Sequence, residues 1–253
     1  MNLTFSTATL VALLLASTRV LAWLVIAPPF ATMGMPRSIR PMVAVALSLA
    51  VTPLAAHHVP PAEIGPLVGA GAVNVAVGAA LGFGTRLIFT AVEAAGSLID
   101  LFGGFSLAFA LDPMSETNTS LFGRFYGLLT TVLIFVSQAH LLIIAGFMRS
   151  FDAIPLNGGV SFAKLDKALV PGMTNMFVAA LQIAGPLIVV LFVADVAMGL
   201  LNRIAPQMNV FALSFPLKIL LTLSLVGLGF ALLPDTVARL AEQGVRFVGG
   251  VTG

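Results

Sequence analysis

Long runs without a charged side chain are the feature of this sequence that most limits its fold. Three of them cover residues 64–85, 125–148 and 168–194, and the last is 27 residues long. A helix of about 20 apolar residues crosses the hydrocarbon core of a bilayer. These runs therefore predict membrane-type helices.

The composition supports the same class. Charged side chains make up 9% of the 253 residues, against about 25% in an ordinary soluble domain, and the mean hydropathy is +1.08. These values exclude a free cytosolic domain, a nucleic-acid binder and a disordered chain. The lack of cysteine excludes disulfide scaffolds, thiolate metal sites and thiol catalysis. Because the apolar runs do not alternate with polar residues as barrel strands do, we predict an all-α fold.

Prolines and glycines mark the ends of the expected helices. Residues 1–18 have no charged side chain, unlike the start of a secretory signal, so we expect residues 9–28 to form a retained helix that ends at Ala27-Pro28-Pro29. We expect two shorter helical runs at 41–58 and 219–234. The expected connections are 31–40, 59–63, 149–167 and 201–218, and the expected last element is a helix over 235–247 with Asp235 as its N-cap.

The region after residue 85 predicts a broken helix. The helix that starts in the 64–85 run should continue to about Asp100 and end at Gly103-Gly104. Apolar residues then alternate with small ones over 105–111, before a polar turn over 112–120. An apolar segment that is not helical cannot face lipid, because its backbone groups would be unpaired. We therefore expect it to be buried in protein or to line a cavity.

Five charged residues lie in or beside the apolar segments. Such residues normally face protein or water and mark a site. They could form a proton or ion relay, or they could form interhelical ion pairs and partner contacts, which is the interpretation we favour. Arg86, Glu93 and Asp100 are spaced by seven residues, which puts them on one face of a helix. One further interpretation pairs Arg19 with Asp195. The five residues are Arg19, Arg86, Glu93, Asp100 and Asp195.

Small residues recur at the spacing used in helix packing. The pairs Gly65/Gly69 and Gly78/Gly82 predict close approach of helix backbones, although a glycine-rich chain also produces such pairs by composition. The positive-inside rule gives no orientation, since alternating spans would divide the basic residues six against five. No nucleotide-binding or catalytic motif is present. We therefore expect no enzyme, with no catalytic residues, metal ligands or cofactor.

Three stretches together resemble the FliR family, the R subunit of the flagellar type III export gate, which is similar to the T subunit of injectisomes. The first covers residues 19–53 and includes the run MPRSIRPMVAVALSLAVTP. The second covers 82–155 and includes GGFSLAFALDP and SFDAIPLN. The third is the apolar connection GLLNRIAPQMNVFALSFPLK over 199–218, and it is the most specific of the three. The sequence departs from the family at Asp100-Leu101-Phe102-Gly103, where Gly-Leu-Gln-Met or similar is usual.

The resemblance implies a non-enzymatic part of a protein-conducting gate in the bacterial inner membrane, in the basal body of the flagellum. One copy of such a chain joins several P and several Q subunits in a helical assembly. The B and A export proteins associate with this assembly, and rod proteins and unfolded export substrates pass through it; no nucleic acid is expected. Residues 1–170 would resemble a P subunit, and residues 171–253 would resemble a Q-type helical hairpin with a tail.

The resemblance also implies a pore plug over residues 102–118. A plug is buried and lines a channel, as the broken helix already requires. The expected plug residues are Phe102, Gly103, Gly104, Phe105, Leu107, Phe109, Leu111, Asp112 and Pro113. The expected residues of the family connection are Asn202, Arg203, Pro206, Gln207, Asn209 and Phe211.

A different class remains open as an alternative. A stand-alone proton- or ion-coupled transporter would use the acidic residues Glu93, Asp100 and Asp195 as its coupling site. It would be active without partner subunits, whereas a gate subunit would not.

Overall fold

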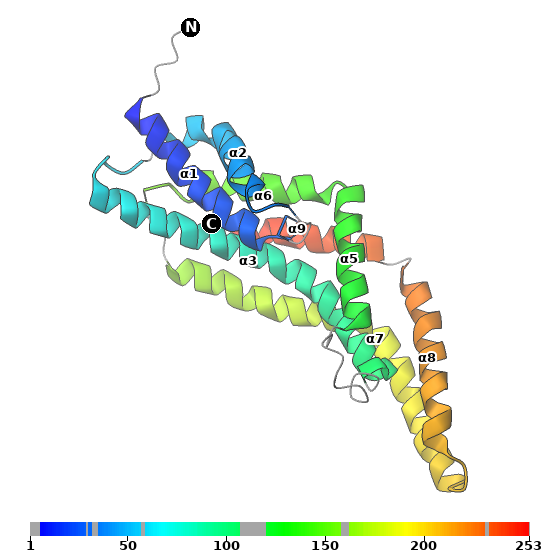
Figure 1. The fold of residues 1–253 in the computed structure, drawn as a ribbon. Coiled ribbons are helices and arrows are strands. Elements are labelled where there is room, and N and C mark those ends of the chain that lie inside the picture. Colours follow the sequence, from blue (N-terminus) through cyan, green and yellow to red (C-terminus); the bar gives the residue numbers. More distant parts are fainter. Residues whose placement is uncertain are drawn as a thin grey trace. The chain divides into compact units, whose positions relative to one another are not determined.

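In its described residues the computed structural model contains helices joined by turns and no strand (Figure 1). It describes residues 6–28, 30–31, 35–56, 59–106, 120–157, 162–230 and 233–252. This confirms the predicted all-α class. The helices are α1 (Thr7–Ile26), α2 (Ile39–Ala55), α3 (Ile64–Gly103), α5 (Leu121–Val136), α6 (Ala139–Ala153), α7 (Phe162–Ile204), α8 (Val210–Gly229) and α9 (Leu233–Thr252).

The chain divides into two compact units, each built from separate stretches of sequence. The first unit contains residues 1–88, 138–173 and 239–253, and the second contains residues 89–137 and 174–238. The predicted division at residue 170 separates a part that resembles a P subunit from a part that resembles a Q subunit. The two compact units are defined by contacts inside the chain and do not test this division, so it stays a prediction.

Helix α1 shows how sequence sets the helix ends. The Ser6 side chain accepts a hydrogen bond from the Thr9 amide at 3.1 Å, which caps the N-terminus. The helix ends at Ile26, one residue before Ala27-Pro28, as predicted. Within the first unit, α1 lies beside the first half of α3 (Figure 1), and Leu15, Val20 and Trp23 of α1 are buried.

In the described part of the chain, three helices are long and apolar enough to cross a membrane: α1, α3 and the 169–204 part of α7, with a fourth span if the bent pair α5 and α6 counts as one. In α7 only 22% of the most apolar window is buried inside this chain. The predicted break of α3 is confirmed, because the helix ends at Gly103 and Gly104 takes a left-handed conformation with φ of 83°. Glycine adopts this conformation without strain.

The charge-free run 125–148 does not form one straight helix. Helices α5 and α6 are bent by 81° at a break over Ser137-Gln138, where Gln138 has φ of 58°. An apolar run shows that a segment lies in an apolar environment, but it does not show whether the helix continues straight through the segment. The polar sequence Ser137-Gln138 was the local sign of a break.

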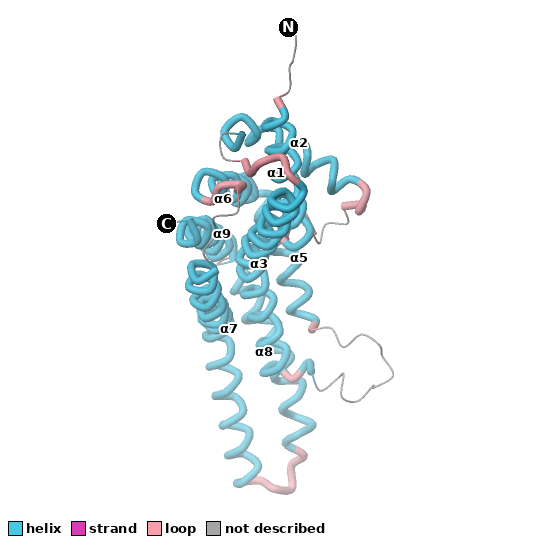
Figure 2. The backbone as a smooth tube through the Cα atoms, turned by 90° about the vertical axis from the view of Figure 1, so that its left-hand side faces the viewer, coloured by secondary structure: helices cyan, strands magenta, loops and turns pink. Residues whose placement is uncertain are grey.

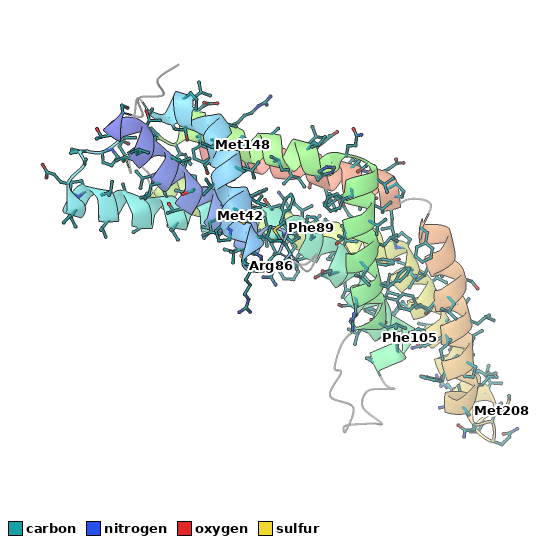
Figure 3. All side chains as sticks on the ribbon, turned by 45° about the horizontal axis from the view of Figure 1, so that its top comes forward. Met42, Arg86, Phe89, Phe105, Met148 and Met208 are labelled. Carbon is teal, nitrogen blue, oxygen red and sulfur yellow. The ribbon has the colours of Figure 1, made fainter. Side chains whose placement is uncertain are left out.

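Two other boundaries also differ from expectation. Most of the expected connection 201–218 is helical, because α7 continues to Ile204 and α8 starts at Val210 (Figure 2). Only a short turn around Pro206 remains, and Met208 lies at this tip of the α7–α8 hairpin (Figure 3). Helix α9 starts at Leu233, so Asp235 lies in its first turn and is not its N-cap. An acidic residue is favourable in either place, since the helix N-terminus is positive.

Candidate functional site

Arg19 forms the most extensive buried polar network in the described part of the first unit. Its side chain has no exposed surface. The Nε atom donates to Asn74 Oδ1 at 2.9 Å, and Nη1 donates to the carbonyl oxygen of Ile154 at 2.9 Å. Weaker contacts at 3.4 Å reach the carbonyls of Ser150 and Pro155. Arg19 thus links α1 to α3 and to the C-terminal end of α6.

No carboxylate takes part in this network. The negative potential comes from the carbonyl groups at the end of α6, which carry the negative end of the helix dipole. The Phe151 ring adds a cation–π contact, with its centroid 4.5 Å from the guanidinium carbon. Asn74 completes the site, because its Nδ2 donates to the carbonyl oxygens of Ala70 and Leu156 at 2.8 and 3.0 Å.

Glycines allow α1 and α3 to approach closely at this network. A Cβ atom at Gly78 would overlap the Arg19 carbonyl, and one at Gly82 would lie 3.0 Å from Ile26 Cβ. Close packing is therefore confirmed for this pair. Gly65 and Gly69 have nothing within 4 Å of a Cβ position, so the prediction of close packing is wrong for that pair within this chain.

The pairing of Arg19 with Asp195 was wrong. Asp195 belongs to the second unit, where its Oδ1 lies 2.6 Å from Nζ of Lys218. Asp195 is 44% exposed and Lys218 is 20% exposed. The ion pair joins α7 to α8 within the hairpin.

Asp100 occupies the other buried charged position in the described residues. Its side chain is 3% exposed. Its Oδ2 accepts hydrogen bonds from the Ser120 hydroxyl and from the Phe122 amide, the latter at 3.0 Å. Ser120 also caps α5, because its Oγ accepts from the Gly123 amide at 2.8 Å. The end of α3 is thereby joined to the start of α5.

Residues at the break of α3 pack against α5 and α8 inside the second unit. The Thr222 hydroxyl lies 2.8 Å from a Cβ position at Gly103, and Gly104 faces the Phe215 ring. Phe105 meets Phe122 edge to face, with centroids 5.2 Å apart. Among the expected plug residues, the structure therefore describes the first four. The others, Leu107, Phe109, Leu111, Asp112 and Pro113, lie outside the described residues.

The five predicted charged residues do not form one buried set. Arg19 and Asp100 are buried, but Arg86, Glu93 and Asp195 are exposed within this chain. In Figure 3 the Arg86 side chain points away from the ribbon. Spacing by seven therefore does not put all three charged residues of α3 on a buried face. Their role as partner contacts stays a prediction.

The family connection forms the turn between α7 and α8. Asn209 is the N-cap of α8, since its Oδ1 accepts from the Ala212 amide at 3.1 Å. Asn202, Arg203, Pro206 and Gln207 are exposed, and the Phe211 side chain is outside the described part. Pro206 ends the preceding helix, and Asn209 is a typical start for the next one.

Three residues of these sites escaped the sequence reasoning: Asn74, Ser120 and Thr222. Asn74 is buried in the charge-free run 64–85, and Thr222 is buried in α8. A search for charged side chains passes over all three, although a lone amide in an apolar helix is itself a signal. Within the described residues, no group of three or more histidine and acidic side chains could hold a metal ion.

Comparison with known proteins gives consistent matches over most of the chain. Residues 10–244 match the model of a family described as bacterial export proteins, family 1. The flagellar biosynthetic protein FliR of Escherichia coli strain K12 is 33% identical over 217 residues, which cover 85% of this chain and 82% of that protein. FliR of Bacillus subtilis strain 168 is 34% identical over 149 residues, or 56% of each chain. The secretion system apparatus protein SsaT of Salmonella typhimurium is 31% identical over 151 residues, covering 59% of this chain and 58% of that protein.

Proposed function

This chain belongs to family 1 of the bacterial export proteins, and we propose that it is a structural subunit of the flagellar type III protein export gate. It is an all-α membrane protein of flagellar biosynthesis and protein export. The proposed location is the inner membrane, in the basal body of the flagellum.

One observation carries this proposal. The family match runs from residue 10 to residue 244, so it includes the N-terminal helix, the broken helix α3 and the α7–α8 hairpin. The 33% identity to a flagellar biosynthetic protein extends over more than four fifths of both chains. A match of this length is not explained by shared hydrophobicity in one or two helices.

In the proposed gate, the chain is part of the channel wall and supplies a plug over residues 102–118. The apolar character of residues 105–111 supports this role, because a row of apolar side chains seals a pore against water and ions. The left-handed Gly104 also supports it, since it turns the chain out of α3. Residues 1–170 would take the place of a P-type subunit and residues 171–253 that of a Q-type hairpin.

The proposed partners are several P and several Q subunits around one copy of this chain. The B and A export proteins would associate with this gate, and rod proteins and unfolded substrates would pass through it. The exposed apolar face of α7, with Phe192 and Val193 about 60% exposed, supports an assembly in which other helices or lipid cover the chain. The proposed role is mechanical and involves no catalysis.

The assembly is tested by co-expression with the P and Q subunits of the same bacterium, followed by native mass measurement in mild detergent. We expect one discrete heteromer that contains a single copy of this chain. A stable monomer or homodimer that ignores both partners would overturn the proposal.

The plug is tested by replacing residues 105–111 with Gly and Ser in the assembled gate. We expect the membrane of cells that carry this variant to leak small ions. The same replacement over residues 59–63, a connection outside α3, is the matched control and should leave the membrane tight. A tight membrane with the 105–111 variant would remove the plug from the proposal.

The described contacts of two of the three acidic residues do not support the transporter alternative. Asp195 is paired with Lys218, and Asp100 binds the start of α5. Both contacts join two helices, which is typical of residues with a structural role. Transport activity of the purified chain without partners would reverse this choice.

A further inference from the structure

One face of α7 is exposed within the second unit and carries two polar side chains. On the other side of the helix, Ala184, Leu187 and Leu191 are buried. A helix turns by about 100° per residue, so Gln182 lies nearly opposite these three residues. Asn175 lies seven residues earlier and therefore on the same face as Gln182. Both carboxamide side chains are exposed.

The residues of this face follow the spacing that helices use when they pack along one another. Steps of three and four residues alternate from Asn175 to Gly199, which is the heptad pattern. The four large apolar side chains in the pattern are 45–61% exposed, and a Cβ atom at Gly185 or Gly199 would have nothing within 4 Å. We call this set the α7 seam, and it consists of Asn175, Val178, Gln182, Gly185, Val189, Phe192, Val196 and Gly199.

The two carboxamides favour a protein helix over lipid as the neighbour of the seam. Asn175 and Gln182 lie inside residues 169–204, the part of α7 that is long and apolar enough to cross a membrane. Lipid tails offer no hydrogen bond, and a carboxamide without a partner in an apolar medium costs free energy. In membranes, asparagine and glutamine side chains bond across to other helices, and glycines let the helix backbones approach.

Pro186 adds a further unpaired group beside Gln182. Proline has no amide hydrogen, so the carbonyl oxygen of Gln182 lacks the donor that the residue four positions later would otherwise supply. In a helix within a membrane, a neighbouring helix can provide the missing hydrogen bond. A polar side chain opposite Gln182 would therefore have two groups to bind, the carbonyl oxygen and the carboxamide.

Charge makes a second copy of this chain a poor occupant of the seam. Two copies inserted into one membrane in the same direction would pack in parallel, so each residue of the seam would face itself. Arg203 is the next position of the same repeat and is exposed, so it would meet the Arg203 of the other copy. Like charges repel at this distance. The seam therefore fits a different chain, with an acidic side chain opposite Arg203.

We propose that the α7 seam is the docking surface for one helix of a partner subunit of the gate. That helix lies along α7 at the crossing angle of heptad packing, about 20°. It carries hydrogen-bonding side chains opposite Asn175 and Gln182, and its backbone comes close at Gly185 and Gly199. This inference rests on the proposed function, because the proposed assembly supplies the partner.

Thiol labelling tests the position of the docking surface. The chain contains no cysteine, so single cysteines can be placed one at a time over residues 175–199. Maleimide labelling is compared between the isolated chain and its heteromer with P and Q subunits, in the same detergent. We expect the heteromer to lose labelling at the seam positions. Val190→Cys and Ala197→Cys, at exposed positions beside the seam, are the controls and should label equally in both samples.

The labelling pattern also decides between the possible occupants. A heteromer that forms but leaves the seam as reactive as in the isolated chain would overturn the inference and leave the proposed function in place. A homodimer linked by a disulfide through Gln182→Cys would overturn it in favour of a second copy. If the unaltered chain forms no heteromer at all, the proposed function fails and the inference fails with it.

Substitutions test whether the seam contacts a helix or lipid. Each hydrogen bond between membrane helices contributes about threefold to association, so Asn175→Leu with Gln182→Leu should weaken heteromer formation by about tenfold. Gly185→Leu should also lower the yield, because a large side chain keeps the helices apart. Gly227→Leu on α8, where a Cβ atom also has open space, is the matched control and should leave the yield unchanged. Full yield with the seam variants, at equal amounts of folded chain, would place lipid on the seam and overturn the inference.

Discussion

At the scale of single residues, the burial of a charged side chain determines which hydrogen-bond partners it needs. A guanidinium group inside an apolar unit must replace its lost hydration with hydrogen bonds from the protein. Arg19 does so with Asn74 and with carbonyl oxygens at the end of α6. One side chain from α1 therefore holds two other helices in place.

Replacement of Arg19 tests this role. Arg19→Ala should lower the free energy of unfolding by about 3 kcal/mol, because buried carbonyl groups and the Asn74 amide lose their partner. Arg19→Lys should lower it by about half as much, since an ammonium group cannot reproduce the planar fork. Unfolding by SDS in mixed micelles provides the measurement. Arg37→Ala, at an exposed position, is the control and should stay within about 0.5 kcal/mol of the unaltered chain.

A second test at this scale compares Gly78, which is tightly packed, with Gly69, which has open space around it. Gly78→Ala should destabilise the chain by about 1–3 kcal/mol, because the added methyl group meets the Arg19 backbone. Gly69→Ala has open space and should stabilise it by about 0.5–1 kcal/mol through helix propensity. Equal melting temperatures for the two variants would contradict the close packing of α1 on α3.

At the scale of elements, breaks in helices matter as much as their lengths. Helix α3 is followed by Gly104 in a left-handed conformation, whereas the α5–α6 break uses Gln138 in the same region of backbone space. Glycine suits this conformation, but other residues lose about 1–2 kcal/mol in it. The left-handed conformation of Gln138 is therefore held by the surrounding structure and not by local preference.

Substitution of Gln138 checks this statement. Gln138→Gly should raise the free energy of unfolding by about 1 kcal/mol, and Gln138→Val should lower it by at least about 1 kcal/mol. Gln138→Asn should be nearly neutral, because asparagine tolerates the left-handed region. SDS titration of the three variants gives the order. A Gly variant less stable than the Val variant would show that the bend does not use this conformation.

At the scale of the whole molecule, the chain does not cover its own apolar surface. Leu191 and Phe192 are neighbours on α7, but Leu191 has no exposed surface and Phe192 is 59% exposed. In a monomeric soluble protein, large apolar surfaces of this kind mark contact with another protein or with a membrane. We therefore expect another protein or the membrane to cover this apolar surface of α7.

Substitutions of Leu191 and Phe192 distinguish packing inside the chain from contact with partner subunits. Leu191→Ser should lower the stability of the isolated chain in detergent by about 2–5 kcal/mol. Phe192→Ser should leave that stability within about 1 kcal/mol but reduce the yield of the heteromer with P and Q subunits. SDS titration and native mass give the two readouts. An unchanged yield for Phe192→Ser would place this part of α7 against lipid.

The sequence by itself determined the class of this protein, the approximate place of most helices and the break at Gly103-Gly104. These properties follow from apolar composition and from glycine and proline, whose effects are local. It also determined the family, because the family motifs follow the chain in order.

Only the tertiary structure decided which charged residues are buried and what they bind. One interpretation of the sequence paired Arg19 with Asp195, but in the structure Arg19 binds backbone carbonyls and Asp195 binds Lys218. Backbone carbonyls and helix ends carry charge without leaving a mark in the sequence, so an opposite side-chain charge is the only partner that sequence reasoning can propose. Asp100 likewise found its partners at the start of a helix 20 residues later, where a serine hydroxyl and a backbone amide meet it.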